Sequence, residues 1–184
     1  MNLLRLMQVV GTRRLGYNSR SVKDEDSRRE RVMKELNAQE AYDLMQADPE
    51  YIYLDVRSVP EFEAGHPMRA INIPIMHFAP GTGMSPNQDF ATVVEAALAK
   101  DAKLVVGCKT GGRSARACEE MSQMGFTNVA NVRGGFVGAM DNLGRVTEPG
   151  WSMLNLPTCT ECVDEARYKA LAGKAGKSYS SSFR

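Results

Sequence analysis

Residues 103–125 read KLVVGCKTGGRSARACEEMSQMG, and this stretch decides the fold. The apolar run at 104–106 predicts a buried strand. After Arg113, small and apolar residues recur at helical spacing until Gly125 ends the pattern, which predicts a helix. Cys108 therefore stands at the carboxyl end of a predicted strand. A tight loop of polar and flexible residues then carries the chain into the predicted helix.

The surroundings of Cys108 predict a reactive thiol. A cysteine with the ordinary pKa of about 8.5 is mostly protonated at neutral pH. Here the start of the helix offers unpaired amides and a partial positive charge, and Gly111 and Gly112 let further amides turn inward. Lys109 and Arg113 add full charges, so a thiolate and any bound anion are favoured. A small core residue is the alternative, but the polar residues that follow at once argue against it.

Residues 105–114, VVGCKTGGRS, resemble the active-site signature of single-domain rhodaneses, which are sulfurtransferases. In that signature an aliphatic strand runs into Cys-x-x-Gly-x-Arg-Ser. The resemblance extends over about residues 36–157 and implies an α/β fold of three layers, a central parallel sheet with helices on both faces. It also implies that Cys108 is catalytic and carries sulfur as a persulfide. The residues expected to bind substrate are Lys109, Thr110, Gly111, Gly112, Arg113 and Ser114.

Residues 54–74, LDVRSVPEFEAGHPMRAINIP, resemble the second signature of the same family. The match includes the Asp-x-Arg at its start and the Gly-His in its middle. One departure is the run Pro-Met-Arg at 67–69, where the family has Ile-Pro-Gly. The departure predicts a different turn after His66, within an unchanged fold.

The resemblance assigns Asp55 and Arg57 to the support of the site. Asp55 follows a predicted strand, so it either points over the Cys108 loop or caps the next helix. Arg57 is expected to pair with Glu61, one turn along. His66 is interpreted as a hydrogen-bonded turn residue, because a preformed thiolate needs no general base.

Strands and helices are predicted to alternate, which indicates a parallel sheet. Before the Cys108 stretch, the predicted elements are a helix after a capping box at Asn37, a strand at 51–56, a helix from a second capping box at Ser58 to Gly65 and an extended segment at 71–74. A Gly- and Pro-rich loop at 76–86, which borders the site, and a helix at 87–99 follow. After that stretch, the predicted elements are a strand at 126–132, a helix at 136–143, a peripheral helix at 161–171 and a frayed tail at 173–184. Gly134 and Gly135 either let the backbone pass close to the active loop or form an ordinary turn. Trp151 is interpreted as a core residue, because no second aromatic stands beside it in the sequence.

Composition limits the partners. A net charge of +1 gives no field for nucleic acid, and no apolar run approaches the roughly 20 residues of a membrane span. Four cysteines do not make a disulfide framework. Cys159 and Cys162 form a CxxC pair without further ligands nearby, so neither a metal nor another cofactor is expected, and a redox pair is the alternative. Cys118 is interpreted as core packing, with a resolving thiol for Cys108 as the alternative.

Three segments are expected. Residues 1–34 are a targeting segment and linker, 35–158 the rhodanese domain, and 159–184 a C-terminal extension. The first 23 residues are rich in arginine and free of acidic residues, which is typical of a mitochondrial transit peptide and predicts a place in the mitochondrial matrix. The chloroplast or the cytoplasm is the alternative location, and a disordered basic extension is the alternative structure.

The leading functional hypothesis is a sulfurtransferase that moves sulfur from a small anionic donor such as thiosulfate, through a persulfide on Cys108, to a thiol or cyanide. Thioredoxin and glutathione are the candidate physiological thiols. The rival is a protein phosphatase or arsenate reductase on the same scaffold, which places five residues between cysteine and arginine. Here four residues separate Cys108 from Arg113, and the narrower loop favours sulfur. A non-catalytic rhodanese-like binding module is the third hypothesis.

Overall fold

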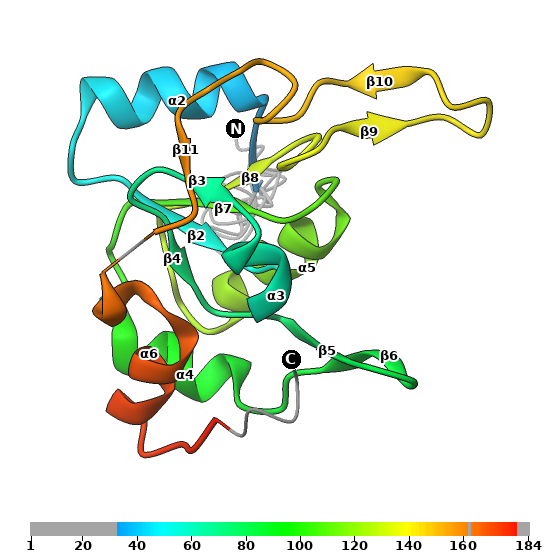
Figure 1. The fold of residues 1–184 in the computed structure, drawn as a ribbon. Helices are drawn as coiled ribbons and strands as arrows, with labels where there is room; N and C mark the ends of the chain where they lie inside the picture. The colour runs from blue at the N-terminus through cyan, green and yellow to red at the C-terminus, as the bar shows by residue number, and fades with distance from the viewer. Residues whose placement is uncertain (1–32, 162, 180–184) are drawn as a thin grey trace, which may run out of the picture. The chain divides into compact units, whose positions relative to one another are not determined.

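A parallel sheet of five strands forms the centre of the computed structural model, which describes residues 33–161 and 163–179 (Figure 1). Its strands are β1 (Lys34–Leu36), β2 (Ile52–Asp55), β4 (Ile71–Asn72), β7 (Leu104–Gly107) and β8 (Val129–Val132). They lie in the order β1-β8-β7-β2-β4, so β7, which precedes Cys108, is the middle strand. The helices are α2 (Ala38–Ala47), α3 (Val59–Glu63), α4 (Phe90–Ala97), α5 (Gly112–Gln123), α6 (Tyr168–Lys174) and the 3-10 helix η1 (Asp164–Ala166).

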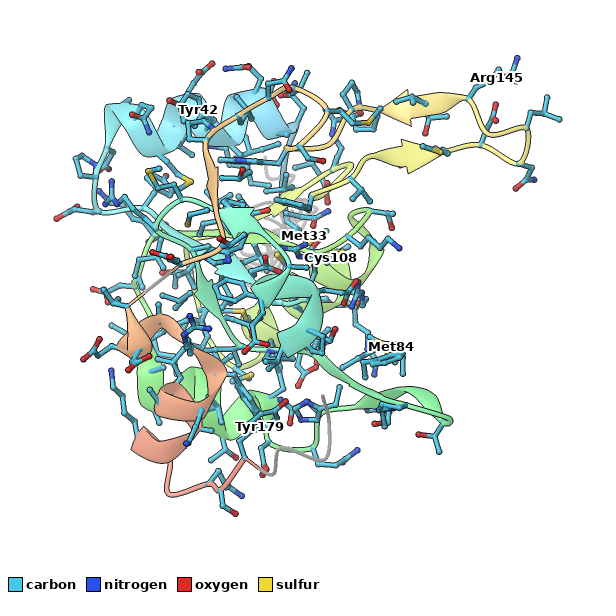
Figure 2. The ribbon with its side chains drawn as sticks, in the orientation of Figure 1. Met33, Tyr42, Met84, Cys108, Arg145 and Tyr179 are labelled. Carbon is cyan, nitrogen blue, oxygen red and sulfur yellow. The ribbon has the colours of Figure 1, made fainter. Side chains whose placement is uncertain are left out.

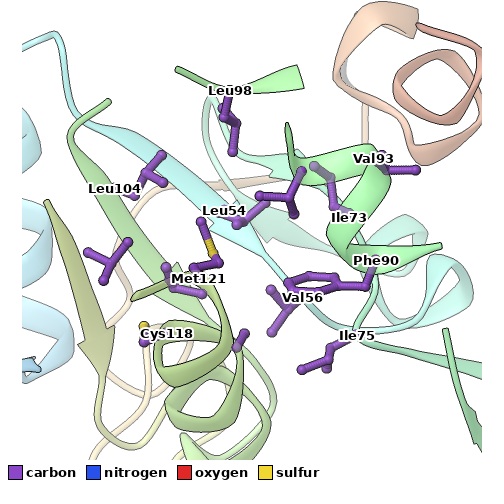
Figure 3. Packing of buried hydrophobic residues seen from close by; sticks show 14 of the residues in the cluster. Leu54, Val56, Ile73, Ile75, Phe90, Val93, Leu98, Leu104, Cys118 and Met121 are labelled. Atoms are coloured by element: carbon purple, nitrogen blue, oxygen red, sulfur yellow. The ribbon is translucent and has the colours of Figure 1, made fainter. Parts of the chain in front are cut away.

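The two faces of the sheet carry separate hydrophobic clusters. Side chains alternate along a strand, so Leu104 and Val106 of β7 join one cluster while Val105 joins the other. The first cluster packs against α4, α5 and α6, and Figure 3 shows Met121 of α5 beside Leu54 of β2. The second packs against α2 and the segment that carries Trp151. Both faces are therefore covered, which explains the unbroken apolar runs of the strands and confirms the predicted α/β architecture.

Local signals placed two helices correctly. Asn37 caps α2, with its side chain accepting from the Glu40 amide at 2.8 Å while Glu40 accepts from the Asn37 amide. Ser58 stands before α3, and its amide donates to the Glu61 carboxylate at 3.0 Å. Each pairing satisfies amides that the first helical turn leaves open.

The segment at 76–86 is a β-hairpin, so the predicted loop is wrong. β5 (Met76–Ala79) pairs with β6 (Gly83–Pro86) in antiparallel register. Gly81 and Gly83 have φ angles of 86° and 81°, values that glycine adopts without strain. The glycines therefore allow a tight connection between two strands instead of marking an irregular loop.

The predicted helix at 136–143 is also wrong. The chain instead forms β9 (Ala139–Met140), which pairs with β10 (Val146–Glu148). Gly138 has a φ of 96°, which a helix cannot contain. Leu143, which completed the apolar pattern, is 77% exposed and joins no core.

The C-terminal segment packs closely on the domain. β11 (Thr158–Cys159) pairs with β3 (His66–Pro67), and α6 contacts α4 with Tyr168 and Leu171 buried. The predicted helix at 161–171 therefore starts later, at Tyr168, and extends into the predicted tail. Trp151 is 1% exposed, which confirms its core role, although it makes edge contacts with Tyr42 and Tyr53 that the sequence did not indicate.

Some sequence-based predictions lie outside the described residues. These are the transit peptide with most of its linker, Cys162 of the CxxC pair, and the last five residues of the predicted tail. In the part of the chain that the structure describes, no helix combines the length and the apolar character that crossing a membrane requires.

Candidate active site

The thiol of Cys108 lies at the end of β7 with 1% of the residue exposed. The Gly111 amide donates to its Sγ atom at 3.2 Å. Ser114 Oγ lies 3.4 Å from the same sulfur and 3.0 Å from the Gly111 carbonyl oxygen, so its single proton has two alternative acceptors. The buried sulfur therefore has one amide donor and one hydroxyl within hydrogen-bonding distance.

The loop reverses direction at Gly111, which has a φ of 101° and precedes the first residue of α5. An added Cβ there would lie 3.2 Å from the Gly134 amide nitrogen. Because the Gly111 amide at the start of α5 donates to Cys108 Sγ, the positive end of the helix lies directly beside the thiol. Of the other predicted substrate-binding residues, Lys109, Thr110 and Gly112 are exposed.

A second backbone segment clamps the loop from outside. The Phe136 amide donates to the Cys108 carbonyl oxygen at 2.8 Å, and the Val137 amide donates to that of Lys109 at 2.9 Å. Gly135 makes this approach possible, since a Cβ at that position would overlap the Cys108 carbonyl oxygen. The close approach expected for the glycine pair is confirmed, and the ordinary turn is not what forms.

Arg113 does not present a free charge to the loop. Its two terminal nitrogens donate to the two Glu61 carboxylate oxygens at 2.7 Å each. Burial would raise the pKa of Glu61, but the hydrogen bonds from Arg113 and Ser58 outweigh that effect and lower it to about 2. The expected pair of Arg57 with Glu61 is therefore wrong, because Arg113 occupies the carboxylate. The sequence carries no signal for a contact across 52 residues.

Asp55 and Arg57 form a buried pair with each other. Arg57 donates to Asp55 Oδ2 at 2.6 Å and to the Gly65 carbonyl oxygen at 2.7 Å, and its guanidinium lies 4.1 Å from the centre of the Phe136 ring. Asn72 adds hydrogen bonds to the carbonyl oxygens of both. Asp55 also accepts from the Arg57 amide, so it fixes the turn before α3 without capping that helix. The pair thus contacts Phe136 and fixes the turn before α3.

Comparison with known proteins agrees with this geometry. The sequence profile described as Rhodanese-like domain matches residues 37–141. The chain belongs to the rhodanese-like domain family. The chloroplastic thiosulfate sulfurtransferase 16 of Arabidopsis thaliana is 39% identical over 106 residues, which are 58% of this chain and 86% of that protein. The senescence-associated protein DIN1 of Raphanus sativus is 39% identical over 61% of this chain and 60% of its own.

Two further similarities are relevant. The mitochondrial protein HIGH ARSENIC CONTENT 1 of Arabidopsis thaliana is 42% identical over 89 residues, which are 48% of this chain and 52% of that protein. The chain thus spans less than two thirds of two of these three relatives. The crystal structure of Rv0390 from M. tuberculosis superposes with a TM-score of 0.58 at 23% identity, covering 71% of this chain and 99% of that one. This likeness shows the rhodanese-like fold alone.

His66, Cys118 and Cys159 make contacts outside the hydrogen bonds of the Cys108 loop. His66 Nδ1 donates to the Phe62 carbonyl oxygen at 2.8 Å, and the two rings stack at 3.8 Å. The expected hydrogen bond is therefore present, although His66 lies in β3 and not in a turn. Its Nε2 lies 3.2 Å from Cys159 Sγ. Cys118 is buried, and burial raises its pKa to about 12, in agreement with core packing. Within residues 33–161 and 163–179, no cluster of three or more His, Cys, Asp or Glu side chains could hold a metal ion.

A pocket of about 660 Å³ opens beside the loop. It is walled by α3 and its neighbours, by the β5–β6 hairpin, and by the two cationic residues that follow Cys108. Its lining residues are Ser58, Pro60, Glu61, Ala64, Met76, Phe78, Met84, Lys109 and Arg113. The segment at 76–86 therefore borders the site, as expected, and Figure 2 shows Met84 on the hairpin and Cys108 further inside the fold.

Proposed function

We propose that this protein is a sulfurtransferase that uses Cys108 as its nucleophile. The Cys108 thiolate attacks the outer sulfur of an anionic donor such as thiosulfate, the S–S bond of the donor breaks, and sulfite leaves. The persulfide on Cys108 then gives its outer sulfur to a thiol or to cyanide. The observation that carries the proposal is the buried Sγ atom that accepts from the Gly111 amide at the start of α5.

The loop suits both half-reactions. Fixed amides and the end of α5 stabilise negative charge on sulfur without reorganising, and burial strengthens that effect. We assign substrate binding to residues 109–114 of the loop. Asp55 and Arg57 position it from behind, with no contact to the reacting sulfur. Covalent transfer in two steps predicts ping-pong kinetics.

Intact-mass spectrometry after treatment with thiosulfate tests the proposal. The expected result is a gain of one sulfur atom on Cys108, located by peptide mapping, and its loss on addition of cyanide. Cys108→Ser abolishes both the gain and the turnover, whereas the matched control Cys159→Ser retains them. Normal turnover by Cys108→Ser refutes the assignment.

A second candidate is the reduction of arsenate, which the name of the relative HIGH ARSENIC CONTENT 1 brings forward. Four residues separate Cys108 from Arg113, one fewer than on the scaffold of arsenate reductases, and the narrower loop favours the single outer sulfur of a persulfide over arsenate. A direct comparison of thiosulfate and arsenate turnover, with glutathione as the thiol in both, ranks the two. Faster arsenate turnover reverses our order.

We also propose that residues 1–34 direct the domain at 35–158 to an organelle, with 159–184 as an extension. The composition at 1–23 supports this, and similar proteins carry chloroplastic or mitochondrial in their names. Imaging of a fluorescent fusion with and without residues 1–34 distinguishes the mitochondrion from the chloroplast. A diffuse signal from the intact fusion contradicts the proposal.

A further inference from the structure

We propose that the pocket beside the Cys108 loop binds the sulfur acceptor, and that this acceptor is a small thiol with one anionic group and an apolar body the size of an aromatic ring. The proposal rests on the proposed function and specifies the second half-reaction. The pocket measures about 660 Å³, and volumes of about 300–1,000 Å³ hold drug-sized ligands, whereas thiosulfate and cyanide are ions of two to five atoms.

The walls of the pocket favour an apolar ligand. Met76 and Phe78 of β5 and Met84 of β6 form one side, and Pro60 and Ala64 at α3 form the other. Phe78 and Met84 are each 39% exposed, so a ligand that covers them removes apolar surface from water. Thioethers adapt their shape and make favourable contacts with aromatic rings. A ring is therefore the apolar group that these walls fit.

The charges of the pocket favour one anion. Glu61 and Arg113 neutralise each other through their paired hydrogen bonds. Lys109 is exposed, and within the described residues its ammonium has no ion pair or hydrogen bond, so the lining carries a net charge of +1. Lys109 also follows Cys108 directly. An acceptor whose carboxylate pairs with Lys109 and whose ring contacts the hairpin would hold its thiol at the mouth of the loop.

The transfer then balances without another reactant. The acceptor thiolate attacks the outer sulfur of the Cys108 persulfide, and a new S–S bond forms. The bond between that sulfur and Cys108 Sγ breaks, and its electron pair stays on Sγ. The acceptor leaves as a persulfide and the Cys108 thiolate is restored, so the sulfur atom has moved with no net oxidation or reduction.

Three acceptors test the proposal with the full chain and thiosulfate as donor. N-benzoylcysteine and N-acetylcysteine share the thiol and the carboxylate and differ in the ring, so we expect kcat/KM to be at least tenfold higher for the benzoyl compound. N-benzoylcysteinamide lacks the carboxylate, so we expect its kcat/KM to be several-fold lower than that of N-benzoylcysteine. In Lys109→Met the two compounds should have equal kcat/KM values. Cyanide, which is too small to need the pocket, reports the Cys108 chemistry alone.

Variants on the hairpin complete the test. Phe78→Ser and Met84→Ser should raise KM for N-benzoylcysteine and leave cyanide turnover unchanged. Met140→Ser on β9 is the matched control, since Met140 is 59% exposed and does not line the pocket. It should leave both reactions unchanged.

The outcomes separate this inference from the function on which it rests. Equal rates for the benzoyl and acetyl compounds, with cyanide turnover intact, overturn the inference and leave the function standing. Equal effects of Phe78→Ser and Met140→Ser also overturn it. A third outcome also counts against a small thiol. If sulfur transfer to reduced thioredoxin falls in Phe78→Ser while the benzoyl and acetyl compounds react equally, the small-thiol assignment is overturned. Absence of both cyanide turnover and the mass gain on Cys108 overturns the function itself.

Discussion

Replacing Gly135 by alanine should damage the site through the backbone alone. A φ of 56° is left-handed, which costs an alanine about 1 kcal/mol. The added Cβ would also overlap the Cys108 carbonyl oxygen and lie 2.9 Å from the Lys109 carbonyl carbon. Relief requires the two segments to separate, which breaks the hydrogen bonds from the Phe136 and Val137 amides, each worth about 1 kcal/mol. We therefore expect Gly135→Ala to lower the free energy of unfolding by about 3 kcal/mol.

The measurement is urea denaturation followed by the fluorescence of the single tryptophan, together with sulfur transfer from thiosulfate to cyanide. Gly176→Ala is the matched control, because Gly176 has a φ of 68° and an added Cβ there meets nothing within 4 Å. It should lose only about 1 kcal/mol and keep its activity. If the two variants agree within about 0.5 kcal/mol, the error of such extrapolations, and both transfer sulfur normally, the clamp on the loop does not exist as described.

Three further changes have defined outcomes. Arg57→Ala leaves the buried Asp55 carboxylate without its partner, so urea denaturation should show a loss of about 3–5 kcal/mol; a loss below 1 kcal/mol contradicts a buried ion pair. Glu61→Gln removes a carboxylate whose pKa falls from 4.5 unfolded to about 2 folded, so its contribution is complete above pH 4.5 and disappears as the pH falls through 2. The pKa difference sets an upper limit of about 3 kcal/mol for that contribution. Solvent screening reduces it to about 1–2 kcal/mol, since 27% of the side chain is exposed. The free energies of unfolding of wild type and variant should therefore converge in acid. Cys118 should resist iodoacetamide at pH 8 in the folded protein, because burial raises its pKa to about 12; labelling at the rate of an unfolded cysteine, seen by peptide mapping, contradicts this.

The strand, loop and helix around Cys108 could be predicted because their determinants are local. The apolar run of β7, the glycines of the loop and the spacing of α5 each act within a few residues. The capping boxes at Asn37 and Ser58 are local in the same way. Where a residue and its partner lie within one turn, sequence reasoning located the element correctly.

The failures have other causes, and two of them are contacts between residues far apart in the sequence. The segment at 136–143 has a helical spacing of apolar residues, but its first amides bond to the Cys108 loop in place of its own carbonyl groups. Arg113 appeared free because Glu61, its partner, lies on α3 and is brought close only by the fold. Strand β6 of the 76–86 hairpin contains glycine, serine and proline, a composition that also suits a loop. In the first two cases a tertiary contact outweighed a local preference, whereas the hairpin is a local pairing whose composition does not distinguish it from a loop.

The neutralised Arg113 changes where the positive character of the site comes from. With its guanidinium tied to Glu61, Arg113 acts on the buried sulfur as part of an ion pair, so the fixed dipoles of the loop amides and of the start of α5 gain weight beside it, whereas Lys109 stands exposed. Dipoles act only at short range and in one orientation, so their effect depends on the loop holding its shape. That dependence gives a physical reason for the clamp at Gly135 and for the buried Asp55–Arg57 pair behind it. In the proposed sulfur transfer, residues with no hydrogen bond to the sulfur therefore help to set the field around it.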